Sequence, residues 1–139
     1  MIEVGVTDNI DACLDIRRTV FIDEQNVDEA IEMDGLEHEG IHVLLTHDGT
    51  AAGCARIMIN GQVGRIGRVA VLKEFRGLGL GKAIMQECER ILRARVGITQ
   101  ARLGAQNHAI PFYEALGYRV DGDEYFDANI PHRPMVMSL

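Results

Sequence analysis

The stretch FRGLGLGKAIMQECERIL, residues 75–92, places three glycines at alternate positions directly before an apolar pattern with helical spacing. These glycines are Gly77, Gly79 and Gly81. A glycine-rich loop that opens a helix offers unpaired backbone N–H groups at the positive end of the helix dipole, an arrangement that suits phosphate. The stretch therefore predicts a phosphate-binding loop followed by a helix over residues 82–95.

Two familiar phosphate-binding motifs do not fit this loop. A Walker A loop needs a glycine where Arg76 stands and a hydroxyl side chain where Ala83 stands. A dinucleotide fingerprint counted from Gly77 needs its third glycine where Lys82 stands. Both mismatches argue against a nucleotide-triphosphate or dinucleotide site, so the phosphate belongs to another ligand.

The composition indicates one folded domain over residues 1–139. The chain is 47% hydrophobic and 25% charged, which fits a soluble globular protein with a sizeable core. A net charge of −7 argues against a nucleic-acid-binding module, which normally carries a basic face. Cys13, Cys54 and Cys88 are far apart and lie in apolar patterns, so we expect buried thiols and no metal site. No signal-peptide pattern or membrane-length apolar run is present, and we expect a cytoplasmic protein without a membrane partner.

The order of the expected elements predicts an α/β domain with a mixed sheet, neither doubly wound nor a barrel. The Asp48–Gly49 and Asn60–Gly61 pairs are typical of tight hairpin turns. The first helix is expected to be capped by Thr7 or Asp8. In chain order we expect a helix at 6–25, an acidic loop at 23–40, strands at 41–47, 51–59 and 62–72, a helix at 82–95, a strand at 98–106, a short helix at 109–117, and strands at 118–126 and 133–139.

Two segments carry a family resemblance. Arg76 to Gly81 matches the pattern [RQ]-x-x-G-x-[GA] directly after the strand RVAVL, and AQNHAIPFYEALGY, residues 105–118, places an Asn before a helix with F-Y-x-x-x-G-[FY]. In these segments and in element order the whole chain resembles the GNAT superfamily of N-acetyltransferases. VFIDEQ and DANIPHRPM also resemble a bacterial branch of GNAT proteins. The resemblance implies the GNAT fold, a mixed, mostly antiparallel central sheet flanked by helices, and acetyl-CoA (coenzyme A) as cofactor.

The resemblance also implies where the cofactor binds. Backbone N–H groups from Leu78 to Lys82 would hold the pyrophosphate, with Arg76 adding charge at the rim. The pantetheine arm would pair with the strand before the loop, and a backbone N–H near Val69 would stabilise the oxyanion. Asn107 would contact the cofactor or order water beside it. The expected cofactor-binding residues are Val69, Ala70, Val71, Arg76, Gly77, Leu78, Gly79, Leu80, Gly81, Lys82, Asn107 and Phe112.

The same resemblance assigns catalytic roles. Tyr113 matches the tyrosine that serves as general acid toward the departing thiolate in many GNAT enzymes. The general base is less defined. Glu24, at the end of the first helix, borders the acceptor pocket in the family order and is the expected base. His42, His108, His132 and a chain of water molecules remain alternatives.

The expected activity is acetyl-CoA-dependent transfer of an acetyl group to a primary amine, directly within a ternary complex. A non-catalytic acetyl-CoA-binding sensor or interaction module and a longer-chain acyltransferase stay open. The acceptor is expected to be a small-molecule or peptide amine, and a homodimer is expected from the family. Eight acidic residues and no Lys or Arg lie between Asp23 and Glu39, so a cationic amine is expected there unless the segment is only a solvated loop.

Overall fold

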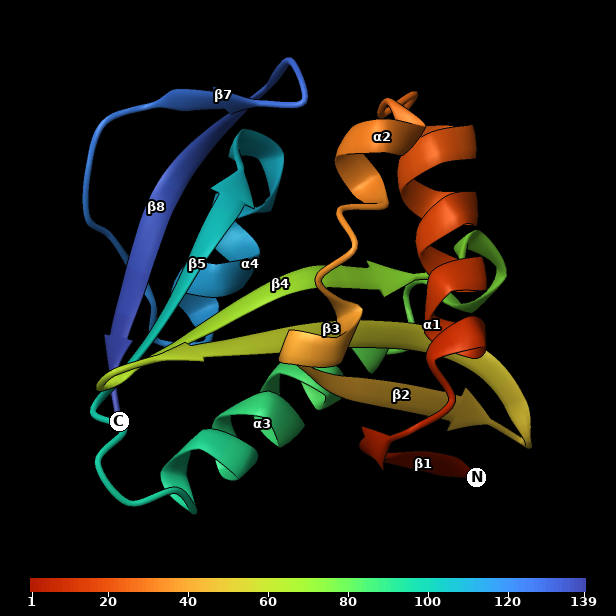
Figure 1. The fold of residues 1–139 in the computed structure, drawn as a ribbon, viewed down its shortest axis with the longest axis horizontal. Helices are drawn as coiled ribbons and strands as arrows, with labels where there is room; N and C mark the ends of the chain where they lie inside the picture. Colours follow the sequence, from red (N-terminus) through yellow and green to blue (C-terminus); the bar gives the residue numbers. More distant parts are fainter.

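The computed structural model describes all 139 residues as an eight-stranded mixed sheet with helices on both faces (Figure 1). The strand order is β1-β2-β3-β4-β5-β8-β6, with β7 paired to β8, and only the contact between β4 and β5 is parallel. The expected mixed, mostly antiparallel sheet flanked by helices is confirmed. None of the helices combines the length and the apolar character needed to cross a membrane.

The elements are β1 (Ile2–Thr7), α1 (Ile10–Arg17), η1 (Arg18–Glu24), α2 (Glu29–Glu32), η2 (Glu37–Glu39), β2 (Ile41–His47), β3 (Thr50–Asn60), β4 (Val63–Val71), η3 (Lys73–Phe75), α3 (Leu80–Arg93), β5 (Gln100–Gln106), η4 (Asn107–Ala109), α4 (Ile110–Ala115), β6 (Arg119–Val120), β7 (Tyr125–Asp127) and β8 (Ile130–Ser138).

The sheet begins with a strand that the sequence did not lead us to expect. β1 pairs antiparallel with β2 along its whole length, so the chain is held extended as far as Thr7. Helix α1 begins only at Ile10, and its N-cap is Asn9, whose side-chain oxygen accepts the N–H of Ala12 at 3.2 Å. The expectation that Thr7 or Asp8 caps this helix was wrong, because the sheet takes up the preceding backbone.

Two apolar cores lie on opposite faces of the sheet. The larger core packs α3 against the strands, with Ile84, Cys88 and Leu92 fully buried. A Cβ on Gly64 of β4 would overlap the side chain of Leu92, so this glycine allows α3 to approach closely. The smaller core packs α1 and the π-helical η1 against β3 and β4, through Cys13, Ile16, Val20, Cys54 and Ala70.

All three cysteines are buried, as expected. Burial raises the pKa of the Cys88 thiol to about 12 and also raises the pKa values of the Cys13 and Cys54 thiols. The neutral thiols therefore behave as small hydrophobic side chains, and a cysteine nucleophile finds no support in the fold.

Turn positions account for the differences from the expected strands. Asn60 pairs with Val63, so the β3–β4 turn consists of Gly61 and Gln62 and not of Asn60 and Gly61. The strand expected over 118–126 is divided into β6 and β7 by a loop in which a Cβ on Gly122 would meet Pro134 at 2.6 Å.

β8 starts earlier than expected because a tight turn joins it to β7. Ala128 and Asn129 form this turn with φ values of 51° and 63°. Both residues are left-handed, which is the pattern of a type I′ hairpin turn. Alanine gives no sequence signal for such a turn, so the hairpin could not be expected from composition.

A chain of ion pairs fixes the acidic segment to the sheet. Arg17 of α1 is 1% exposed and places its Nε 2.5 Å from Oε1 of Glu32. The Nε of Arg68 lies 3.1 Å from the other oxygen of Glu32. Arg56 donates two hydrogen bonds of 2.9 Å to Asp34, which also lies 3.2 Å from Arg68. Each of these partly or fully buried charges therefore has an opposite charge within ion-pair distance, as buried charges in proteins usually do.

Asp34 predicts a specific loss of stability in acid. Hydrogen bonds from Arg56, against the opposing effect of burial, hold the pKa of Asp34 at about 2, below its ordinary 3.8. A depressed folded-state pKa stabilises the fold above the unfolded value, and that contribution is lost as pH falls from 4 toward 2. Asp34→Asn should therefore lower the free energy of unfolding at pH 7 by about 2 kcal/mol and flatten its dependence on pH below 4.

Urea unfolding at pH 7, 4 and 3 measures this effect. Asp123→Asn is the matched control, because Asp123 is exposed and has no ion-pair partner. Equal stability of the two variants at pH 7 would contradict a structural role for the Asp34 ion pairs.

Candidate active site

The candidate site lies where two central strands separate. β4 and β5 pair through only three residue pairs, Val63 to Arg65 with Gln100 to Arg102. Beyond these pairs the strands diverge, as Figure 1 shows, and residues 66–71 of β4 have no partner strand on that side. Backbone groups along this edge are therefore free to pair with an extended ligand.

A β-bulge turns β4 beside this opening. Arg68 and Val69 lie opposite the single residue Ala55 of β3, and Arg68 has a φ of 53°. Left-handed backbone is uncommon for residues other than glycine, and bulges of this kind often re-aim groups next to a functional site. Val69 lines the cavity described next, at the position expected for the oxyanion-stabilising N–H.

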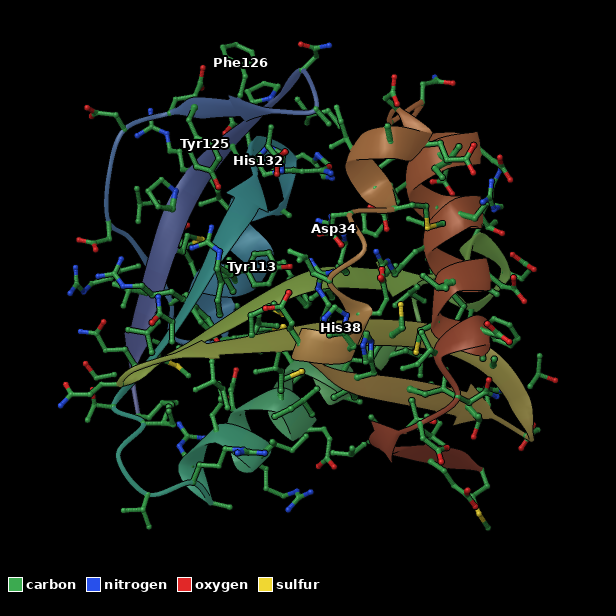
Figure 2. The ribbon with its side chains drawn as sticks, in the orientation of Figure 1. Asp34, His38, Tyr113, Tyr125, Phe126 and His132 are labelled. Carbon is green, nitrogen blue, oxygen red and sulfur yellow. The ribbon has the colours of Figure 1, made fainter.

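A cavity of about 300 Å³ occupies the opening on the face of the sheet that carries α1 and α2. β3, β4 and β5 form its floor, η1 and α2 form one wall, and the segment from β7 into β8 forms the opposite wall. Figure 2 shows Tyr113 between β4 and β5, with Tyr125 and His132 toward β7. The volume suits a small-molecule site.

Tyr113 reaches this cavity from α4. Its ring packs edge-on against Phe112, at 5.0 Å between centroids, and against Tyr118, at 6.1 Å. The Tyr113 hydroxyl makes no hydrogen bond within the protein, and burial raises its pKa to about 12. The phenol therefore keeps its proton at neutral pH and is free to donate it to a ligand.

The glycine-rich loop lies at the far end of the free β4 edge. The first backbone hydrogen bond of α3 runs from the Ala83 N–H to the Gly79 carbonyl at 3.2 Å, so the six N–H groups of residues 77–82 have no acceptor within the protein. Gly77 and Gly79 have φ values of 81° and 78° and open space where a Cβ would stand. α3 begins two residues before the expected position, so its first turn belongs to this open, N–H-lined loop.

Arg76 and Glu24 bind each other. The guanidinium donates two hydrogen bonds to the Glu24 carboxylate, at 2.6 and 2.9 Å, and a third at 3.0 Å to the carbonyl of Val71. The hydrogen bonds from Arg76 lower the pKa of Glu24. Glu24 does not line the cavity, so it is poorly placed to act as a general base there.

The histidine candidates separate into two groups. His108 and His132 line the cavity, whereas His42 does not and bonds the Glu37 carbonyl at 2.7 Å. The Nδ1 of His132 lies 2.7 Å from the Ile130 carbonyl, which can only accept, so this nitrogen carries the proton and Nε2 stays free. His108 and His132 are the imidazoles that the fold brings to the site.

The remaining expected residues surround the opening without lining it. Asn107 is exposed and donates a 2.9 Å hydrogen bond to Glu124. Phe112 is 39% exposed, and its ring edge lies 3.4 Å from the point where a Cβ on Gly81 would stand. Lys82 is exposed in the first turn of α3.

Several cavity residues were not expected from the sequence. Gln106 of β5 donates a 2.9 Å hydrogen bond to Gln25 at the end of η1, which joins the two sides of the opening. Tyr125 lies so close to β5 that a Cβ on Gly104 would overlap its hydroxyl. Arg65 of β4 also lines the cavity. Of these features, only the approach of Tyr125 to β5 had a local signal in the sequence. A glycine within a strand, here Gly104, often marks the close approach of another group.

The acidic segment is not a free negative surface. Six of its eight carboxylates are engaged: Asp28 caps α2, and Glu24, Glu29, Glu32, Asp34 and Glu37 each lie within ion-pair distance of an arginine. These pairings remove most of the negative charge that was expected to attract a cationic amine.

Comparison with known proteins identifies the family. Residues 9–139 match the family model described as an acetyltransferase (GNAT) domain. The chain is 38% identical over 122 residues to the uncharacterized N-acetyltransferase YjcF of Bacillus subtilis, covering 87% of this chain and 86% of that protein. An acyl-CoA N-acyltransferase from Pseudomonas aeruginosa superposes with a TM-score of 0.88, at 26% identity and 99% coverage of both chains. A GNAT family acetyltransferase from Elizabethkingia anophelis, solved with acetyl-CoA bound, shares the fold with a TM-score of 0.74, at 15% identity and coverage of 99% and 98%. The chain therefore belongs to the GNAT family of acetyltransferases and is an N-acetyltransferase.

Proposed function

We propose that this enzyme transfers the acetyl group of acetyl-CoA directly to a primary amine while both substrates are bound. The observation that carries the proposal is the unpaired edge of β4, which leads from the N–H-lined loop to the cavity that holds Tyr113. A ligand with a diphosphate at one end and an amide-bearing arm fits this edge, because the loop suits phosphate and the strand edge suits amides. Acetyl-CoA has both parts.

Each part of the cofactor has a defined place in this proposal. The N–H groups of residues 77–82 hold the pyrophosphate, and the backbone of Val69 to Val71 pairs with the pantetheine arm. Arg76 and Lys82 add positive charge at the rim, and Asn107 and Phe112 flank the arm from α4 and the turn before it. The thioester then lies near Val69 and Tyr113, at the cavity.

The reaction needs two proton movements. The nitrogen of the neutral amine attacks the thioester carbonyl, so a C–N bond forms and the C–S bond breaks. A base accepts the proton that leaves the nitrogen, and Tyr113 donates its phenolic proton to the departing sulfur. The N–H near Val69 stabilises the negative charge on the carbonyl oxygen during attack. His132, through its free Nε2, and His108 are better placed than Glu24 to accept the amine proton.

Gly81→Val should remove acetyl-CoA binding and leave the fold intact. The added side chain would stand at the mouth of the loop, with its Cβ 3.4 Å from the Phe112 ring, and would keep phosphate oxygens from the backbone. We expect at least about a tenfold loss of affinity, because one charge-assisted hydrogen bond alone is worth that much. Titration calorimetry with acetyl-CoA measures the change.

Gln86→Val is the matched control for this substitution. Gln86 is exposed on α3, so the change introduces the same β-branched residue into the same helix away from the loop. If Gly81→Val binds acetyl-CoA as tightly as Gln86→Val, the loop does not hold the pyrophosphate.

Tyr113→Phe should lower turnover and leave acetyl-CoA affinity unchanged. General acid catalysis is typically worth ~10²- to 10⁴-fold, and a thiolate is a fair leaving group, so we expect about 10². Tyr118→Phe is the control, because it removes a neighbouring buried hydroxyl that bonds Glu89 and does not line the cavity. Thiol release with an amine acceptor measures kcat. If kcat for Tyr113→Phe stays within a factor of about two of wild type, far less than the loss expected of a general acid, Tyr113 is a packing residue.

Glu24→Gln distinguishes a catalytic base from a partner of Arg76. Since an exposed ion pair contributes little to stability, freeing Arg76 should tighten acetyl-CoA binding by no more than about fivefold, with kcat nearly unchanged. A base at this position would instead cost about 10² or more in kcat. Steady-state kinetics and calorimetry on the one variant separate the two outcomes.

A further inference from the structure

Arg65 is the one arginine of the cavity without an acidic partner. Arg56 and Arg68 also line the cavity, and both bind Asp34. Arg65 forms no ion pair within 4 Å and no hydrogen bond, and its side chain is exposed along the cavity wall. Its positive charge is therefore free to meet a ligand.

A second free donor converges on the same place. An ideal Cβ on Gly104 of β5 would stand 3.9 Å from Nη2 of Arg65 and would overlap the hydroxyl of Tyr125. The guanidinium and the phenol thus both lie over Gly104, from opposite sides of the opening. The Tyr125 hydroxyl makes no hydrogen bond in the protein, and its ring is stacked on His132 at 5.7 Å, which fixes its direction.

These two groups fit an anion with several oxygens. The guanidinium offers a planar pair of donors that matches a carboxylate or phosphate, and the phenol adds a third donor. The carboxylates of the cavity do not fill this position. Glu32 is bound between Arg17 and Arg68, and Asp127 lies on β7 with no ion pair to Arg65.

The cavity floor between Gly104 and the proposed position of the thioester is open. Gly67 follows Arg65 on the same face of β4, and nothing stands within 4 Å of the position where its Cβ would be. Val69 lies four positions after Arg65 along β4, so the two residues are at most ~13 Å apart at ~3.3 Å per position. The long side chain of Arg65 spans part of that distance.

We propose that the acceptor is an amine that also carries a carboxylate or phosphate, separated from the nitrogen by several bonds and bound by Arg65 and Tyr125. This proposal rests on the proposed function and replaces the cationic acceptor expected from the acidic segment with a zwitterionic one. The amine end lies at Val69 and Tyr113, and the anionic end lies over Gly104. A simple polyamine would leave Arg65 unpaired and would place a second positive charge beside it.

Matched acceptors test the proposal through kcat/KM measured by thiol release. Wild-type enzyme should prefer 6-aminohexanoate over 6-aminohexanamide by about 10- to 100-fold, the range of charge-assisted hydrogen bonds. Arg65→Met should reduce this preference to near unity, and Arg65→Lys should restore part of it. Aminohexyl phosphate in the same assay decides between the two anions.

Arg102→Met is the control. Arg102 stands in register opposite Arg65 on β5, binds Asp121 at 2.9 Å and does not line the cavity, so its loss should leave the preference intact. Tyr125→Phe should lower the preference by a smaller factor than Arg65→Met. A preference that is absent in wild type, or that Arg65→Met and Arg102→Met change equally, overturns the proposal.

Product binding separates this inference from the proposed function. Calorimetry compares N-acetyl-6-aminohexanoate with its amide on wild type and on Arg65→Met, without any turnover. If no amine is acetylated but the anionic product binds better than its amide and only with Arg65 present, the proposed function fails and the anion site stands. If amines are acetylated and the two products bind equally or not at all, the function stands and the anion site is overturned.

Discussion

The three-pair contact between β4 and β5 is the constraint on which the whole site depends. Parallel strands need a crossover connection, and α3 supplies it while packing against the paired end of β4 through the close contact of Gly64 with Leu92. The strands are therefore held together at one end only. Beyond that end they separate, which leaves one edge of β4 without a partner and lets Tyr113 reach the opposite face of the sheet from α4.

Electrostatic pairing determines what surrounds the opening. The ion pairs of Arg17, Arg56 and Arg68 attach the acidic segment to α1, β3 and β4, and so turn a charged loop into a wall of the cavity. Buried pairs of this kind contribute little net stability, because desolvation offsets much of the attraction. They do hold the acidic segment in a fixed position against the sheet. With the carboxylates of this wall engaged, the unpaired charges left at the cavity are few, and Arg65 is the cation among them.

Local patterns in the sequence predicted the glycine-rich loop before α3 and most of the sheet, whereas the lining of the cavity depended on long-range pairing. Leu78 to Lys82 open α3 as the glycine spacing indicated, and β2, β3 and β4 lie within a residue or two of their expected positions. β1 was missed because a short edge strand is defined by its pairing with β2. The Glu24–Arg76 pair joins residues 52 positions apart, and no local signal reveals such a partner.

Because its three thiols are buried, the folded chain is expected to be unreactive with disulfide dyes. Cys13, Cys54 and Cys88 are at most 1% exposed, and burial raises the pKa of each, so little of the reactive thiolate is present. If the proposed reaction takes place, the thiol of released coenzyme A is then the sole source of colour in a continuous assay, with no cysteine replaced. Because unfolding would expose the protein's own thiols, the same dye added without substrate distinguishes a variant that has lost chemistry from one that has lost its fold.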